Sequence, residues 1–226
     1  LCSEMARNLA AQGAKVALLG RNLNKLQKTE KEITDKGGVA ISVSTDVTNE
    51  DQVMAARNKI IDVFGPCDIL VNGAGGNQPD AVTTLTEFSD EELNCMEGVR
   101  GFFNLSMKMF ANVIETNTMG TVIPCFVFGK DMAKKKSGVI VNIASMNSIR
   151  PLSRVGAYGM AKAGVMNFTQ WLAVYLAPAN IRVNAIAPGF FLNDRSTKLL
   201  TTPEGEFTQR GASIIRQTPI DRKSVV

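Results

Sequence analysis

The sequence predicts an α/β protein with a doubly wound parallel sheet, in three layers and in a single domain over residues 1–226. Short, nearly continuous apolar runs alternate with longer helical runs along the chain, as is typical of strands covered by helices on both faces. A length of 226 residues fits one domain, and a 45% apolar composition suffices for a buried core. No repeat or linker-like stretch interrupts this alternation.

Five apolar runs predict the strands, namely Lys15–Gly20, Ala40–Ser44, Cys67–Val71, Val139–Ala144 and Ile181–Ala187. Between them lie six predicted helices, namely Cys2–Gln12, Leu23–Lys36, Glu50–Phe64, Glu91–Met109, Thr118–Lys135 and Tyr158–Leu176. Gly13, Gly37 and Gly65 follow three of these helices, where a left-handed residue is favoured. Asn49 precedes the third helix and can cap its free N–H groups.

Composition excludes several classes of function. The net charge of +4 is spread along the chain, and the one basic run, Lys134–Lys136, is too short for a nucleic-acid interface. No apolar run reaches the length of about 18 residues that a membrane span needs. The absence of histidine excludes a Ser-His-Asp triad and a HExxH zinc site, and we expect no metal. Four widely spaced cysteines predict reduced thiols and a cytoplasmic location.

Ligands of such sheets bind beyond the carboxyl ends of the strands, so the residues after each strand are candidates. Arg21 follows the first predicted strand without an acidic neighbour, which favours the 2′-phosphate of NADP over NAD, although NAD stays possible. Asp46, followed by Val47, can accept from an adenine amino group or cap the next helix. The run from Asn72 to Gly76 contains three glycines, which allow a ligand to approach the backbone closely or form a tight turn.

The strongest pattern combines Ser145, Tyr158 and Lys162. Ser145 ends a predicted strand, and Tyr158 and Lys162 lie one turn apart on one helix face. A free phenol has a pKa near 10 and exchanges protons poorly at neutral pH. A nearby ammonium group favours the phenolate and lowers that pKa, so we expect Lys162 to activate Tyr158 as a general acid–base.

These residues resemble the short-chain dehydrogenase/reductase family, whose members are single-domain NAD(P)-dependent enzymes with a Rossmann-type fold. The run Asn72-Gly73-Ala74-Gly75 is similar to the family's NNAG turn, and Asn117 to its fourth catalytic residue. Ser145, Tyr158 and Lys162 match the family's Ser and YxxxK signature, while Pro188-Gly189 matches the turn beside the nicotinamide. The resemblance implies that Tyr158 and Lys162 also contact the cofactor. It further implies that Asn117 holds a water linking Lys162 to solvent.

The chain departs from the family pattern at both ends. The glycine-rich phosphate loop and the first strand have no counterpart, and Lys223–Val226 continue no recognisable family element. We therefore expect a domain whose first strand and C-terminal elements lie outside these residues.

The 41 residues between Gly75 and Asn117 form a longer segment than most of the family has. With the runs that follow Ser145 and precede Pro188, they resemble the branch of D-mannonate oxidoreductases (fructuronate reductases), near the gluconate 5-dehydrogenases. The resemblance implies interconversion of a secondary alcohol and a ketone on a sugar acid. Candidate substrate contacts are the cations and amides Asn77, Asn147, Arg150, Arg154 and Asn193.

Other functions stay open at this point. The same fold could reduce gluconate-type, 3-ketoacyl thioester, steroid or polyol substrates, or sense nicotinamide state without turnover. The resemblance also implies a homo-oligomer, a dimer or tetramer built partly from the helices 118–135 and 158–176. We expect a small-molecule substrate and neither a nucleic acid nor a membrane as partner.

Overall fold

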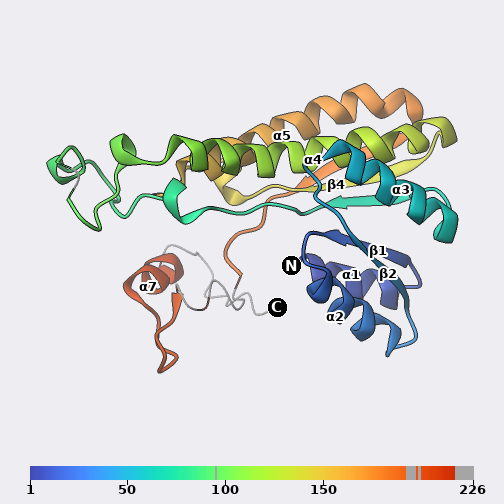
Figure 1. Cartoon of the computed structure of the whole chain (residues 1–226), viewed down its shortest axis with the longest axis horizontal. Helices are drawn as coiled ribbons and strands as arrows, with labels where there is room; N and C mark the ends of the chain where they lie inside the picture. Colours follow the sequence, from blue (N-terminus) through green and yellow to red (C-terminus); the bar gives the residue numbers. More distant parts are fainter. Residues whose placement is uncertain (95, 192–196, 198–199, 217–226) are drawn as a thin grey trace. The chain divides into compact units, whose positions relative to one another are not determined.

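Strands and helices alternate along the first unit of the chain (Figure 1). The computed structural model describes residues 1–94, 96–191, 197 and 200–216, which divide into two compact units at residues 187 and 188. The strands of the first unit are β1 (Lys15–Gly20), β2 (Val39–Ser44), β3 (Ile69–Asn72), β4 (Gly138–Ile143) and β5 (Ile181–Ile186). All five predicted strands are therefore present, with ends shifted by at most two residues.

The longer helices of the first unit are α1 (Cys2–Ala11), α2 (Leu23–Thr34), α3 (Glu50–Phe64), α4 (Met107–Lys135) and α5 (Gly156–Leu176). Asn49 caps α3 as predicted, because its side chain accepts a hydrogen bond from the Gln52 N–H. Gly13, Gly37 and Gly65 adopt positive φ angles between 80° and 89°. Short 3₁₀ turns complete the unit, namely η1 (Pro79–Ala81), η2 (Asp90–Glu92), η3 (Phe102–Asn104), η4 (Met146–Ser148) and η5 (Ala177–Ala179).

All strand pairing is parallel, but it forms two sheets instead of the one predicted. β1 pairs with β2, and β4 lies between β3 and β5. Among the described residues, no strand pairs with both β1 and β3, and the predicted sheet is therefore divided between these two strands. Asn72 and Asn142 are register partners, so the carboxyl ends of β3 and β4 lie level with each other.

Each sheet has its own apolar core. Helices α4 and α5 pack on the larger sheet around Met132 and Ile140, both fully buried. Helices α1 and α2 cover the smaller sheet with small side chains and Ile33. Arg57 of α3 donates two hydrogen bonds to the Asp131 carboxylate of α4 at 2.5 and 2.6 Å, which joins these two helices.

The predicted helix over 91–109 is wrong, and the following helix begins eleven residues earlier than predicted. Gly98 adopts a φ of +77°, and the buried Glu92 carboxylate accepts from the Phe103 N–H at 2.9 Å. These contacts hold Glu92 beside Phe103, so the segment forms two 3₁₀ turns, at residues 90–92 and 102–104. Helix α4 then begins after Ser106, whose side chain accepts from the Met109 N–H.

The second unit begins at Pro188 and contains α7 (Gln209–Arg216). Thr201 and Phe207 form an isolated antiparallel bridge around a turn with Gly205 at a φ of +86°. The prediction of one domain over 1–226 stays a prediction. Among the described helices, none is both long and apolar enough to cross a membrane.

Candidate active site

The carboxyl ends of β3 and β4 meet α4 and α5 around four predicted catalytic residues. Ser145 follows β4, Asn117 lies within α4, and Tyr158 and Lys162 lie on α5. Ser145, Asn117 and Lys162 are buried, and Tyr158 is half-buried. The structure thus brings together side chains that are 45 residues apart in sequence.

The Ser145 hydroxyl acts on Tyr158 as a hydrogen-bonding group that lowers the pKa of the phenol. The Ser145 hydroxyl also accepts from the Asn147 N–H at 3.1 Å, which fixes its orientation at the start of η4. Burial raises the pKa of Tyr158 above its ordinary value of 10.0, and the Ser145 hydrogen bond opposes that rise. Tyr158 is therefore a protonated phenol at neutral pH in this structure.

Lys162 lies beside Tyr158 but does not lower its pKa here, contrary to the expectation from the sequence. Its Nζ is 5.7 Å from the centre of the Tyr158 ring and donates to the Ile143 backbone oxygen at 2.7 Å. Burial lowers the pKa of Lys162 to about 8, since a charged ammonium is poorly solvated there. Desolvation is the largest cause of both pKa shifts, and it is opposed by Ser145 at Tyr158 and by the charge of Cys2 at Lys162.

Asn117 joins α4 to the glycine-rich turn that follows β3. Its Nδ2 donates to the backbone oxygens of Gly76 and Val113 at 2.8 and 2.7 Å, and its Oδ1 accepts from the Gly76 N–H at 3.2 Å. A Cβ built on Gly75 would overlap Asn117 Oδ1 and lie 3.4 Å from Lys162 Nζ. A glycine is thus required where this turn passes the two side chains.

A buried polar network behind the site was not predicted. Asn72 donates from Nδ2 to Asn142 Oδ1 at 2.9 Å and also contacts the Cys125 sulfur. Asn142 donates in turn to the Thr169 hydroxyl of α5 at 2.9 Å. Asn142 interrupts the apolar run of β4, and this could have predicted the network, because a buried amide needs hydrogen-bond partners on neighbouring elements.

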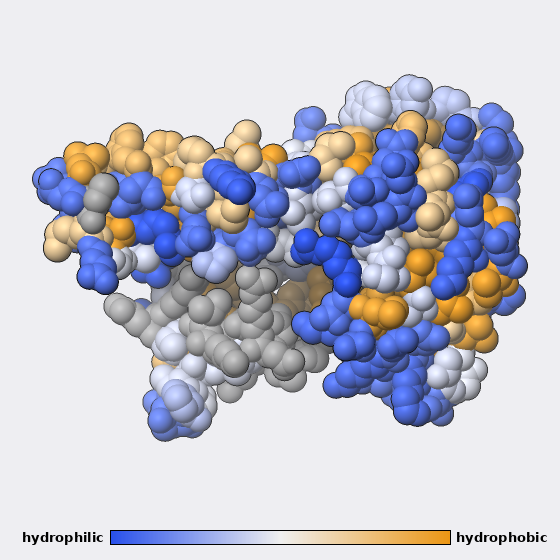
Figure 2. Space-filling view, in the orientation of Figure 1, coloured by the Kyte–Doolittle hydropathy of each residue, from blue (hydrophilic) through white to orange (hydrophobic). Residues whose placement is uncertain are grey.

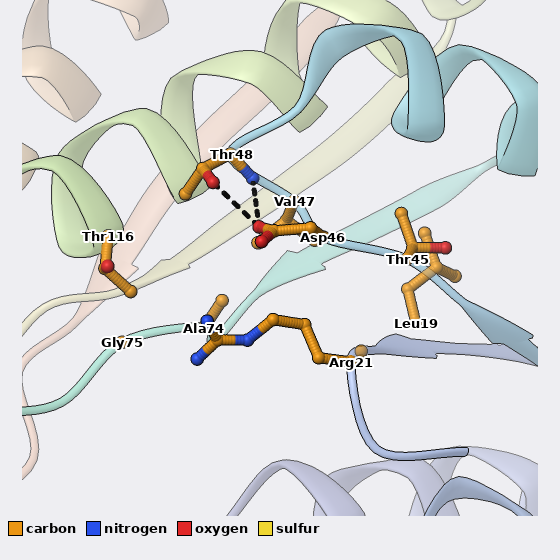
Figure 3. A pocket seen from close by; sticks show the side chains of 10 residues that line it. Leu19, Arg21, Thr45, Asp46, Val47, Thr48, Ala74, Gly75 and Thr116 are labelled. Atoms are coloured by element: carbon orange, nitrogen blue, oxygen red, sulfur yellow. Dashed lines mark hydrogen bonds between the residues drawn. The ribbon is translucent and has the colours of Figure 1, made fainter.

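A second group of predicted residues lines a pocket at the carboxyl ends of β1 and β2 (Figure 3). Arg21 extends across this pocket toward Ala74, below Asp46. Asp46 Oδ1 accepts from the N–H and the hydroxyl of Thr48, so it braces its own turn and does not cap α3. The lining residues are Leu19, Gly20, Arg21, Thr45, Asp46, Val47, Thr48, Ala74, Gly75 and Thr116.

This pocket contains Arg21, Asp46, Val47, Ala74 and Gly75 of the predicted cofactor residues, and the sequence missed Thr48 and Thr116. Its open backbone at Gly75 and its polar turn fit the adenosine half of a dinucleotide.

Of the predicted substrate contacts, Asn147 is buried, and its Oδ1 accepts from the Leu152 N–H at 2.8 Å. Asn77 is half-buried, whereas Arg150 and Arg154 are exposed. Asn193 lies outside the described residues. Pro188 and Gly189 begin the second unit and are described only within it.

The family model for short chain dehydrogenases matches residues 1–204 of the chain. The chain belongs to this family. The family accounts for the parallel α/β fold, and it makes the protein an NAD(P)-dependent oxidoreductase acting on CH–OH or carbonyl groups.

The chain is similar to several curated proteins and solved structures. The chain is 44% identical over 222 residues to an uncharacterised oxidoreductase of Bacillus subtilis, covering 98% of this chain and 78% of that one. It is similar to a crystal structure of a candidate D-mannonate oxidoreductase from Haemophilus influenzae with bound NAD, at 42% identity and a TM-score of 0.92, covering 99% and 79% of the two chains. A 2-dehydro-3-deoxy-D-gluconate 5-dehydrogenase of Formosa agariphila is 30% identical over 86% of this chain and 67% of that one.

Proposed function

We propose that this dehydrogenase transfers hydride reversibly between a nicotinamide cofactor and a sugar acid of the D-mannonate/D-fructuronate type. The observation that carries the proposal is its likeness to the candidate D-mannonate oxidoreductase, at a TM-score of 0.92. The relative that acts on 2-dehydro-3-deoxy-D-gluconate supports the same class of substrate. The substrate would be a secondary alcohol in one direction and a ketone in the other.

Four side chains have distinct parts in this proposal. Tyr158 donates a proton to the carbonyl oxygen in reduction and accepts it in oxidation. Ser145 hydrogen-bonds the same oxygen and stabilises the charge that develops on it. Lys162 holds the nicotinamide ribose and supports the ionisation of Tyr158, and Asn117 holds a water beside Lys162. The nicotinamide supplies the hydride chemistry when it is bound.

The protonation states of the site support this assignment. Tyr158 is a protonated donor at neutral pH because burial raises its pKa, and this suits the reductive direction. Oxidation needs the phenolate form of Tyr158. The pKa of Tyr158 must therefore be lowered by a positive charge that acts on it more strongly than in this structure. Lys162 is the cation placed to supply it, 5.7 Å from the ring.

Cofactor choice depends on Arg21 in this proposal. The guanidinium extends across the adenosine-end pocket, where it can bind a 2′-phosphate (Figure 3). The similar crystal structure contains NAD, so support for a preference for NADP comes from Arg21 alone. Asn72, Gly73, Pro188 and Gly189 complete the proposed cofactor contacts. Replacing Arg21 with Ala should raise the KM for NADP more than the KM for NAD.

We include a homo-oligomer, a dimer or tetramer, in the proposal. Trp171 and Tyr175 of α5 stack at 5.1 Å, and both are more than half exposed. Phe126 of α4 and Val174 of α5 are also exposed. Figure 2 shows hydrophobic side chains among polar ones along the edge formed by these helices. Among the described residues, the cysteines at positions 2, 67 and 125 are free thiols, which supports the proposed reducing, cytoplasmic location.

One assay panel tests the proposed function. Absorbance at about 340 nm, a property of the reduced nicotinamide, is followed with NAD(H) and NADP(H) against D-mannonate, D-fructuronate and gluconate. A 3-ketoacyl thioester and a polyol serve as competing substrates. We expect the highest kcat/KM for a sugar acid, and Tyr158→Phe should lower its turnover by about 100-fold or more. A higher kcat/KM for the thioester or polyol would contradict the proposal, as would cofactor binding without turnover of any substrate.

A further inference from the structure

Arg154 has an unusual backbone conformation close to the candidate active site. Its φ is +72°, in the left-handed region that residues with a Cβ rarely adopt. Among the described non-glycine residues, Lys136 and Asn180 share this feature, and both end helices, where such a conformation is common. Arg154 instead lies in the loop between η4 and α5, before the first helical turn.

The backbone of Arg154 is hydrogen-bonded to a neighbouring segment. We use "the arm" for the described residues 79–94 and 96–106, which begin with η1 and end before α4. Thr83 of the arm donates its N–H to the Arg154 backbone oxygen at 3.0 Å. Thr83 is itself held on both sides, since Arg100 Nε donates to the Val82 oxygen at 2.8 Å and the Thr84 N–H donates to the Arg100 oxygen at 2.7 Å. A strained conformation persists where its surroundings over-determine it in this way.

The same contacts connect Arg154 to the reacting groups. Ala81 of the arm is fully buried against Val113 and Ala157, and Ala157 precedes Tyr158. At the other end of the loop, the Leu152 N–H donates to Asn147 Oδ1, and the Asn147 N–H donates to Ser145 Oγ. The backbone of Arg154 is thus fixed between Ser145 and Tyr158.

The guanidinium of Arg154 is available to a ligand. The side chain is exposed and has no ion-pair or hydrogen-bond partner among the described residues. Other cations near the site are engaged, because Lys162 donates to the Ile143 oxygen and Arg100 to Asp80 and Val82. Arg150 is the other free guanidinium of this loop, but its backbone is unstrained.

We propose that Arg154 binds the carboxylate of the substrate, and that the arm places it by holding its backbone in the left-handed conformation. This inference rests on the proposed sugar-acid function. A guanidinium can bind a carboxylate through two parallel hydrogen bonds, and a rigid backbone lowers the entropy lost on binding. Arg154 would therefore determine specificity for acids over uncharged sugars.

The test compares Arg154→Gly with Arg150→Gly, two variants that lose the same charge from the same loop. Gly adopts the left-handed conformation without strain, so Arg154→Gly should unfold no lower than the parent protein. Arg150→Gly should unfold about 1–3 °C lower, since Gly gains freedom in the unfolded chain. The KM for D-mannonate should rise about 10- to 100-fold in Arg154→Gly, because the variant loses its charge-assisted contact with the carboxylate. Arg150 was also a predicted substrate contact, but this inference assigns the carboxylate to Arg154 alone. The KM should therefore change less than about 2-fold in Arg150→Gly.

Further readouts separate a role in binding from a role in folding. Arg154→Lys should keep a KM nearer the parent value, because it keeps the charge. The KM for D-mannonate should rise with ionic strength in the parent protein and much less in Arg154→Gly.

Two outcomes would overturn the inference. One is a KM for D-mannonate that Arg154→Gly leaves unchanged, and the other is an equal rise in both glycine variants. A parent protein that turns over no sugar acid would instead remove the proposed function itself. Turnover of sugar acids by the parent protein thus distinguishes a failure of this inference from a failure of the proposed function.

Discussion

Lys162 donates a hydrogen bond from Nζ to the backbone oxygen of Ile143 at 2.7 Å, at the carboxyl end of β4. The ammonium is thereby held at the strand end next to Ser145, with 3% of the residue exposed. Burial makes this charge costly, which is why the pKa of Lys162 falls to about 8. The site therefore contains an ammonium group that the cofactor-free fold stabilises poorly. A bound ribose hydroxyl or a phenolate at Tyr158 can stabilise the charge of Lys162.

The first prediction concerns stability and pH. Because the folded pKa of Lys162 is about 8 and its ordinary value is 10.5, the unfolded chain binds more protons between these values. The contribution of Lys162 to the free energy of unfolding should therefore rise with pH from about 8 to 10.5, by on the order of 3 kcal/mol at most.

Denaturant unfolding of the cofactor-free protein across this pH range measures the effect, with Lys162→Met as the reference. The difference between the two proteins is the relevant quantity, since Cys67 and Cys125 have raised pKa values of about 11 and 12 and titrate in both. Parallel curves for the two proteins would contradict a lowered pKa at Lys162.

The second prediction concerns the hydrogen bond between Ser145 and Tyr158. This bond lowers the pKa of Tyr158 against the larger effect of burial, so Ser145→Ala should raise that pKa further. In the oxidative direction, the rise of kcat/KM with pH should move to higher pH in Ser145→Ala. The maximal rate should fall about 100-fold, because a donor to the developing charge is also lost. A lower rate with an unmoved pH profile would show that Ser145 does not act on the ionisation of Tyr158.

The third prediction concerns Gly75. A Cβ there would overlap Asn117 Oδ1, and the φ of +148° is strained for other residues. Gly75→Ala should therefore displace Asn117, lower the unfolding temperature and weaken nicotinamide binding. Gly129→Ala is the control, because Gly129 lies inside α4 with no atom within 4 Å of a built Cβ. That substitution should raise the free energy of unfolding by about 0.5–1 kcal/mol through helix propensity. Fluorescence titration with NADH and thermal melts measure both variants.

The strands and the reacting groups could be predicted because their signals are local. Continuous apolar runs reveal buried strands, and Ser145, Tyr158 and Lys162 stand at spacings that only one arrangement of strand and helix explains. The first eleven residues of α4 were missed because the preceding helix was predicted over 91–109, across the start of α4. Gly120, Pro124 and Gly129 lie inside the predicted range 118–135, and tertiary packing carries the helix through them.

The residues that the sequence could not place depend on distant contacts. The Glu92 carboxylate accepts a hydrogen bond from the Phe103 N–H, and the hydrophobic periodicity of the sequence does not predict that bond. The pKa values of Tyr158 and Lys162 follow from burial, which is a property of the folded chain and not of the YxxxK spacing. The left-handed backbone of Arg154 is likewise hydrogen-bonded to Thr83, more than 70 residues away.

The last prediction concerns the proposed oligomer and the aromatic side chains on α5. Trp171 stacks on Tyr175 at 5.1 Å and lies 5.9 Å from Phe168, yet the indole is 55% exposed. Aromatic groups of this size are rarely left in water unless a partner covers them. Trp171→Glu should leave the subunit folded, because the side chain is exposed, but should place an unpaired charge in the subunit contact.

Sedimentation velocity at several concentrations should give a dimer or tetramer for the parent protein and a smaller species for Trp171→Glu. Phe102→Glu is the matched control, since Phe102 is 63% exposed on the arm and should keep the parent's mass. A parent protein that sediments as a monomer at all concentrations contradicts the proposed oligomer. If both variants lower the mass, the arm also contributes to the contact, and α5 is not its main surface.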